Sequence, residues 1–186
     1  FSEAEIRAAV EEAALYETQV AAHAHGAEGI KRAVRAGVRS IEHGSLMDDE
    51  SIALMAEHGT FLVADVWMGD WSIEQGEREG WSPDVMRKLR ETTDAQREGF
   101  AKAVEAGVRI AFGTDSGTYP HGMNAKQFAS MVKYGMTPLE AIRSATVIAA
   151  ELLGWRDRVG ALEPGLFADL VAVEGDVMND VDFKVF

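Results

Sequence analysis

Apolar residues along the chain follow two alternating patterns, one typical of helices and the other typical of buried strands. In residues 3–17 the apolar side chains recur three and four positions apart, and Ser2 with Glu5 forms a predicted capping box at the helix start. A short apolar run follows as a predicted strand, and the same order then recurs along the chain. The predicted helices are 3–17, 29–36, 49–57, 83–106, 125–134 and 138–149, and the predicted strands are 19–22, 38–42, 60–66 and 108–112.

Three predicted helices end at a glycine that leads directly into a strand, at Gly37, Gly59 and Gly107. Parallel strands need a crossover connection that returns the chain to the same end of the sheet, so this dense alternation predicts an α/β fold with a parallel sheet. The strands are nearly continuous apolar runs, as expected when both faces are covered. Four strands within the first 115 residues correspond to half of an eight-stranded (β/α) barrel.

A long connection, residues 66–82, follows the third predicted strand. Long loops at this position of a barrel are often lids over a pocket. The connection carries Trp67, Trp71 and Trp81, which either wall such a pocket or hold the loop against the barrel.

The tail differs from the rest of the chain because it is rich in turns. It leads into residues 168–173, a predicted short strand outside the barrel. We therefore expect residues 1–155 to form the second half of a barrel and residues 156–186 to be a separate segment. The chain has no initiating Met and closes on Phe186 amid further apolar residues, so we expect it to be a piece of a longer protein.

Composition narrows the possible functions. With 31 acidic against 18 basic residues the net charge is −13, which argues against binding to a nucleic-acid backbone. No apolar run approaches the length of a membrane span, and the acidic start lacks the pattern of a signal peptide, so we expect a cytoplasmic protein without a membrane partner. The absence of cysteine excludes disulfides and thiolate zinc sites, so any metal must be held by histidine and carboxylate.

Three residues at the carboxyl ends of predicted strands are candidate metal ligands. His23 and His43 end two consecutive strands, and Asp115 closely follows the last one. A single histidine at a strand end is more often a core or loop residue, but three at equivalent ends of a (β/α) barrel fall where active sites are built. Imidazole and carboxylate suit Zn²⁺, Mn²⁺ or Fe²⁺, and such a metal lowers the pKa of its bound water toward about 7. Asp115 is then the candidate to take the proton of that water and deliver it to a leaving amine.

Four further residues have weaker signals. His25 lies two positions after His23, so it points the same way and is either a substrate contact or a surface turn residue. His121 lies in a loop after the last strand, where it either binds an anionic substrate group or shapes a Pro-Gly turn. Tyr119, in the same loop, is a further candidate for substrate binding. His58 ends a helix, where partial positive charge is favoured, so we assign it a structural role.

Three motifs resemble the amidohydrolase superfamily. In chain order Ala22–Gly26, Ile41–Gly44 and Gly113–Gly117 are similar to strands five, six and eight of that superfamily, closest to its imidazolonepropionase-like and Xaa-Pro dipeptidase or carboxypeptidase-like branches. Supporting similarities are Tyr119–Gly122, Asn124–Phe128, Thr137–Ile142, Ser144–Thr146 and Gly165–Val171.

The resemblance implies a distorted TIM barrel of which this chain supplies strands five to eight, with residues 156–186 returning to a small β-sandwich. It also implies that His23 and His43 hold one metal of a binuclear centre, and that Asp115 holds the other and acts as general base. The superfamily's paired histidines of the first strand and its metal-bridging lysine of the fourth strand have no counterpart in this chain. We therefore expect the chain alone to be inactive.

These observations predict a metal-dependent hydrolase, most simply zinc-dependent, that cleaves a C–N bond with metal-activated water. The expected substrate is a small molecule or dipeptide, with a peptide bond to a C-terminal Pro or basic residue. Hydrolysis of a cyclic amide, as by an imidazolonepropionase-like enzyme, is the alternative within enzymes. A non-catalytic barrel fragment or scaffold is the alternative from another class, and the choice between monomer and homo-oligomer stays open.

Overall fold

The computed structural model describes residues 1–179 and confirms an α/β fold built on a parallel sheet. The strands β1 (Ala21–Gly26), β2 (Ser40–Leu46) and β3 (Phe61–Val63) lie side by side in that order, and both pairings are parallel. A single parallel bridge from Leu62 to Ile110 adds the next run of the chain to the sheet. Sequential order with a helix between neighbouring strands is the arrangement of consecutive βα units.

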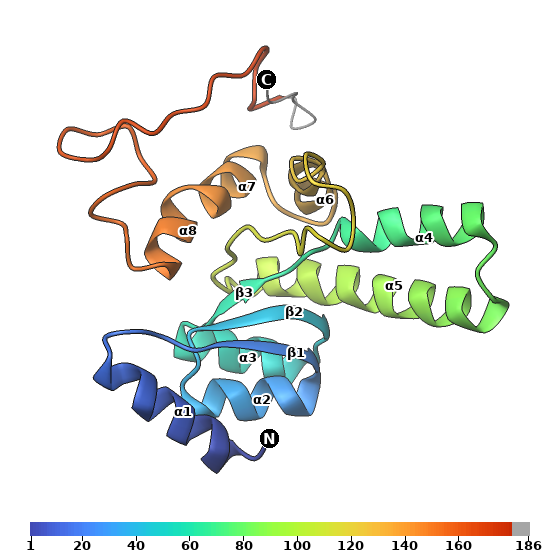
Figure 1. Cartoon of the computed structure of the whole chain (residues 1–186), viewed down its shortest axis with the longest axis horizontal. Helices are drawn as coiled ribbons and strands as arrows, with labels where there is room; N and C mark the ends of the chain where they lie inside the picture. Colours follow the sequence, from blue (N-terminus) through green and yellow to red (C-terminus); the bar gives the residue numbers. More distant parts are fainter. Residues whose placement is uncertain (180–186) are drawn as a thin grey trace.

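The helices surround this sheet in three groups (Figure 1). One group lies along one side of the strands, a second is an antiparallel pair that projects sideways, and the third lies near the carboxyl-terminal segment. In chain order the groups are α1 (Glu3–Leu15), α2 (Ala27–Ala36) and α3 (Asp49–His58); α4 (Met68–Glu79) and α5 (Pro83–Glu105); and α6 (Lys126–Lys133), α7 (Pro138–Ala145) and α8 (Val147–Leu152).

The sequence signals for helix ends correspond to local structure. The capping box of α1 forms as predicted, because Glu5 N donates to Ser2 Oγ while Ser2 N donates to Glu5 Oε2. Gly37 and Gly59 end α2 and α3 with φ of 93° and 66°, a left-handed conformation in which glycine avoids the Cβ clash.

Apolar side chains from the helices and strands form one continuous core. Ile41 of β2 and Phe61 and Leu62 of β3 are fully buried, whereas β1, which was expected to be a buried strand, is exposed or half-buried along its whole length. The fully buried members with the largest side chains are Ile30, Val34, Ile41, Met55, Phe61, Leu62, Val66, Phe100 and Met131.

The segment predicted as a long loop is mainly helical, so that prediction was wrong. Residues 68–79 form α4, which packs against α5. Gly69 and Gly76 are points where α4 approaches its neighbours closely. A Cβ at Gly69 would overlap the Thr93 side chain, and one at Gly76 would overlap Met86.

Other element boundaries also differ from the predicted ones. β1 continues past His23 to Gly26, so His25 is a strand residue. The predicted strand 108–112 pairs with the sheet only at Ile110, because its neighbour β3 is three residues long. Phe112 N donates instead to Ser144 O of α7. The helix predicted for 138–149 is divided into α7 and α8 at Thr146, whose φ and ψ are −122° and −97°.

In the strand predicted for 168–173, only Val173 forms a β-bridge within the described residues. Leu170 and Val171 are 66% and 72% exposed there, and no strand of the described part pairs with them. Residues 180–186, the end of the expected 156–186 segment, lie outside the described residues. Within residues 1–179, none of the helices is long and apolar enough to cross a membrane.

Candidate metal centre

Five polar side chains meet at the carboxyl edge of the sheet. His23 and His25 belong to β1, His43 belongs to β2, Asp65 follows β3, and Asp115 follows the next run of the chain. Carboxyl ends of parallel strands lie at one edge, so residues far apart in the sequence are brought together there. The structure thus places the three predicted ligands, together with His25, at one location.

The three histidine rings are in mutual contact. The ring centroid of His23 lies 4.7 Å from that of His25 and 4.6 Å from that of His43. His25 and His43 are stacked, with centroids 4.8 Å apart and an interplanar angle of 21°. Three rings this close can direct nitrogen atoms at one small cation.

Two overlapping sets of donor atoms fit a divalent cation. One ligand atom from each of His23, His25 and His43 lies within 4.8 Å of the others, and the same holds for His43, Asp65 and Asp115. His43 is common to both sets. Imidazole nitrogen with carboxylate oxygen is a ligand set used by zinc and similar metals when thiolate is absent. The donor chemistry therefore agrees with a metal centre.

A hollow of about 260 Å³ is lined by four of these five side chains, all except His25. It lies where the strands end, and its wall combines ionisable side chains with the small residues that follow the last strand. The lining residues are His23, Glu42, His43, Val63, Asp65, Gly113, Thr114 and Asp115.

The backbone is strained at two of the candidate ligands. His43 has φ of 68° and Asp115 has φ of 49°, both in the left-handed region that side chains with a Cβ rarely adopt. The pairing of β1 with β2 also changes register after Ala24, next to His43. Such strain and strand irregularities gather at functional sites, where they direct a side chain toward a ligand.

A buried carboxylate, Asp65, faces the ring of His43. Asp65 is 2% exposed, and its Oδ1 lies 3.3 Å from His43 Nδ1 and accepts a hydrogen bond of 2.9 Å from Gln96 Nε2. Asp65 raises the pKa of His43 against the opposing effect of burial. Burial raises the pKa of Asp65, but the facing imidazole outweighs burial and holds that pKa below its ordinary value.

The contact between these two residues is within ion-pair range but falls short of hydrogen-bond geometry. His43 Nδ1 and Asp65 Oδ2 are both buried and have no hydrogen-bond partner among residues 1–179. Buried polar atoms without partners are costly, so they mark a place that is arranged for a further group. Since His43 Nδ1 faces Asp65 Oδ1, the atom with accepting capacity left for such a group is Asp65 Oδ2.

Two neighbouring side chains, His25 and Glu42, also have shifted pKa values. His25 Nδ1 lies 2.9 Å from Ser45 Oγ, and burial lowers the pKa of His25, with His43 and His23 adding to the effect. Burial raises the pKa of Glu42, although Ser40 Oγ donates to its carboxylate over 2.5 Å. His25 is therefore favoured in its neutral form, in which one ring nitrogen keeps a lone pair.

Tyr119 lies inside an aromatic cluster instead of on the surface of its loop. It is 3% exposed, and its ring centroid lies 4.8 Å from that of Trp67 and 6.0 Å from that of Trp71. Burial raises the pKa of Tyr119, and its hydroxyl has no hydrogen-bond partner in the described part of the chain. Trp81 lies apart from this cluster and is 39% exposed, with Nε1 donating to Glu79.

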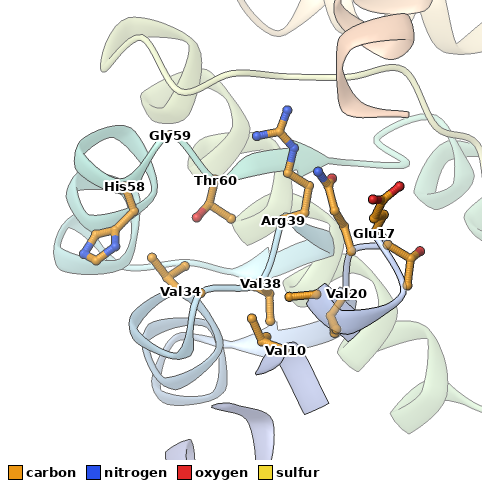
Figure 2. A pocket seen from close by; sticks show the side chains of 13 residues that line it. Val10, Glu17, Val20, Val34, Val38, Arg39, His58, Gly59 and Thr60 are labelled. Atoms are coloured by element: carbon orange, nitrogen blue, oxygen red, sulfur yellow. The ribbon is translucent and has the colours of Figure 1, made fainter. Parts of the chain in front are cut away.

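A second hollow, of about 500 Å³, lies at the opposite edge of the sheet (Figure 2). Val10, Val20, Val34 and Val38 converge in it, and His58 lies at its margin, so the predicted structural placement of His58 at the end of α3 is confirmed. This hollow is larger, but none of the candidate ligands lines it. Of these two hollows, the smaller one is lined by the donor side chains that a metal needs.

Comparison with protein families agrees with this geometry. The model of the amidohydrolase family matches residues 1–185, nearly the full sequence. The chain belongs to the amidohydrolase family. The resemblance inferred from the three strand-end motifs is thereby confirmed.

Relatives of this amidohydrolase chain include proteins with several named activities. It is 38% identical to an ochratoxinase of Aspergillus niger over 188 residues, covering 100% of the chain and 38% of the relative. It is 32% identical to an imidazolonepropionase of Geobacillus kaustophilus over 146 residues, which cover 77% of the chain and 30% of the relative. Among solved structures, a Xaa-Pro dipeptidase with methionine bound in its active site superposes with a TM-score of 0.90 at 44% identity. The match covers 97% of this chain and 45% of the dipeptidase. The chain thus spans less than half the length of these relatives.

Sequence reasoning missed two residues that line the candidate site, Asp65 and Glu42. Asp65 lies within the predicted strand 60–66 and Glu42 ends the predicted strand 38–42, and both strands were expected to be buried. For Asp65 the available signal was a single acidic residue near the carboxyl end of an otherwise largely apolar run; Glu42 had only its position at a strand end, next to His43. His121, by contrast, does not line the hollow; it is exposed, with Nδ1 3.1 Å from Ser116 Oγ.

Proposed function

We propose that this chain is part of a metal-dependent hydrolase that cleaves a C–N amide or peptide bond. The observation that carries the proposal is the convergence of His23, His43 and Asp115 at the carboxyl edge of the sheet, around a hollow with buried, unpartnered polar atoms. The Xaa-Pro dipeptidase and ochratoxinase among its relatives favour hydrolysis. A dipeptidase or carboxypeptidase acting before a C-terminal Pro or basic residue is the activity we propose first.

The proposed enzyme is completed by residues outside this chain. We assign its strands to positions five to eight of a TIM-type barrel, and residues 156–186 to a segment that returns to a small β-sandwich domain. The histidine pair of the first strand and the lysine of the fourth strand are then contributed by the remainder of the barrel. The coverage of less than half of each relative is consistent with this assignment.

His23 and His43 would hold one divalent cation, and Asp115 would hold a second; zinc is the proposed metal. When bound, such a cation supplies Lewis acidity and lowers the pKa of a coordinated water toward about 7. Asp115 is the proposed general base, since it is exposed at the hollow and not paired with a cation in the described residues. A carboxylate at this place accepts a proton on one side of the substrate and returns it to the leaving amine.

The substrate is proposed to lie over the histidines. His25 presents a neutral imidazole beside His43 and is suited to a hydrogen bond with the carbonyl of the scissile bond. Tyr119, with Trp67 and Trp71 around it, supplies a hydroxyl with an unused hydrogen-bonding capacity. His121 is the proposed contact for the terminal carboxylate of a dipeptide.

Substitution of His43 tests this function. In the whole natural protein that carries this chain, His43→Ala should remove bound metal and hydrolysis of Xaa-Pro, Xaa-Lys and Xaa-Arg dipeptides together. His58→Ala is the matched control because His58 lies at the opposite edge of the sheet. Metal content by mass spectrometry and product release by amino-acid analysis are measured side by side. Full turnover by His43→Ala with normal metal content would contradict the assignment of His43 as a metal ligand.

Hydrolysis of a cyclic amide is the second candidate. The specific observation in its favour is the similarity to imidazolonepropionase over 77% of the chain. The same protein assayed with imidazolonepropionate and with dipeptides distinguishes the two, since ring opening and peptide release give different products. Turnover of neither substrate class by the metal-loaded protein would favour a non-catalytic scaffold.

A further inference from the structure

We propose that Asp65 and Gln96 are positioning residues, which hold the His43 ring in the tautomer and orientation that a metal ligand needs. The inference rests on the proposed function of His43. A carboxylate accepts an N–H but repels a nitrogen lone pair, so Asp65 Oδ1 at 3.3 Å favours a proton on His43 Nδ1. The lone pair is then on Nε2, the other ring nitrogen, which is left for the metal.

Gln96 holds this arrangement from α5. Its Nε2 donates to Asp65 Oδ1 over 2.9 Å and lies 3.4 Å from the main-chain oxygen of His43. One amide group therefore contacts both the strained backbone of His43, with φ of 68°, and the carboxylate that faces its ring. Gln96 is 5% exposed and Asp65 is 2% exposed, so bulk water is excluded from substituting for either group.

Neither residue needs to touch the substrate for this role. Asp65 faces the His43 ring at the wall of the hollow, and Gln96 contacts Asp65 and the main chain of His43, so the proposed effect of both is on the orientation of that ring. Outer partners of ligating histidines commonly change metal affinity by about 10- to 100-fold when they are removed. The order Gln96, Asp65, His43 thus connects α5 to the metal centre through side chains alone.

The experiment uses Asp65→Asn and Gln96→Leu in the whole natural protein, with Thr93→Val as control. Thr93 is on the same helix as Gln96, is 3% exposed and faces Gly69 of α4. Zinc affinity is measured by competition with a chromophoric chelator, and the tautomer of His43 is measured by ¹⁵N NMR of the zinc-loaded protein. The unfolding midpoint is recorded in parallel to separate positioning from a merely structural role.

Asp65→Asn should weaken zinc binding by about 10- to 100-fold and perturb the Nδ1–H signal of His43. Gln96→Leu should weaken binding in the same direction by a smaller factor, and Thr93→Val should leave zinc affinity unchanged. Unaltered zinc affinity in Asp65→Asn would overturn the inference. If Asp65→Asn instead bound one zinc fewer per chain at saturation, Asp65 would be a metal ligand, and the inference would also be wrong.

Failure of this inference is distinct from failure of the proposed function. If His43→Ala loses metal while Asp65→Asn binds zinc normally, the metal centre stands and only the positioning role is wrong. If His43→Ala retains its metal, the proposed site itself is wrong.

Discussion

Lys31 Nζ lies 2.7 Å from Asp48 Oδ2, which joins α2 to the N-cap residue of α3. The same ammonium group lies 3.1 Å from Glu28 and 2.7 Å from Glu50. The Lys31 side chain is only 7% exposed, whereas its partners remain open to solvent. One buried cation surrounded by three carboxylates therefore holds two crossover helices together.

This ion-pair network should make stability depend on pH in the acid range. Hydrogen bonds from Lys31 hold the pKa values of Asp48 and Glu50 below their ordinary values. A carboxyl group with a lowered pKa in the folded state contributes stability above its unfolded pKa, about 4, and loses it as the pH falls through the folded value. We expect the unfolding midpoint to fall as pH is lowered from about 5 to 3.

Lys31→Met is the variant that checks this dependence. It keeps an unbranched side chain only one atom shorter but removes the charge, so the unfolding midpoint should vary less with acid pH than in the wild-type protein. Arg32→Met, at the exposed neighbouring position, is the control. Identical pH profiles for Lys31→Met and the wild type, measured by circular dichroism, would contradict the role of the network.

Gly69→Ala should separate α4 from α5. The new methyl group would overlap the Thr93 side chain, so we expect a loss of about 1–3 kcal/mol in the free energy of unfolding. The double variant with Thr93→Ala restores the space and should recover most of this loss. Denaturant unfolding of the single and double variants is the measurement; equal stability of both would show that the helices do not meet at this point.

Tyr119→Phe should weaken substrate binding without loss of stability. The hydroxyl has no hydrogen-bond partner in the described residues, so its removal leaves the packing against Trp67 and Trp71 intact. A lost hydrogen bond to substrate corresponds to a KM higher by up to about tenfold. Tyr16→Phe, at a position 73% exposed, is the control. An unchanged KM would assign Tyr119 to packing alone.

His121→Ala should discriminate between substrates by their terminal group. Ser116 Oγ, next to Asp115, lies 3.1 Å from His121 Nδ1 and ties the exposed imidazole to the candidate site. For a dipeptide with a free carboxylate we expect KM to rise by about tenfold, whereas the corresponding C-terminal amide should be affected little. Steady-state kinetics on this substrate pair measure the difference, and equal effects on both would rule out contact with the carboxylate.

Local signals in the sequence predicted much of the fold. Gly37 and Gly59 mark helix ends because only a residue without Cβ adopts their conformation at little cost, and the Ser2 capping box is a short-range motif. The helix α4 could not be predicted in the same way. Its residues Gly69 and Gly76 lie where Thr93 and Met86 of α5 leave no room for a Cβ, and such contacts cannot be inferred from the local sequence.

The candidate site was predictable to the extent that it depends on strand ends. His23, His43 and Asp115 follow from the rule that the carboxyl ends of parallel strands meet. Asp65 was missed because its position within an apolar run resembled a buried strand, and its meaning depends on Gln96, which is 31 positions away along the chain. Contacts between residues so far apart are set by tertiary packing.

The strand order has a practical consequence for producing this polypeptide. β1 is the first strand of the sheet, and within residues 1–179 no strand pairs with its outer edge. A largely apolar hollow of about 870 Å³ runs beside that edge, between β1 and the helices α1 and α2. Unpaired main-chain donors and acceptors next to apolar surface are a template for edge-to-edge association. Expressed by itself, the chain should accumulate as aggregates, and its solubility will depend on whatever covers that one strand.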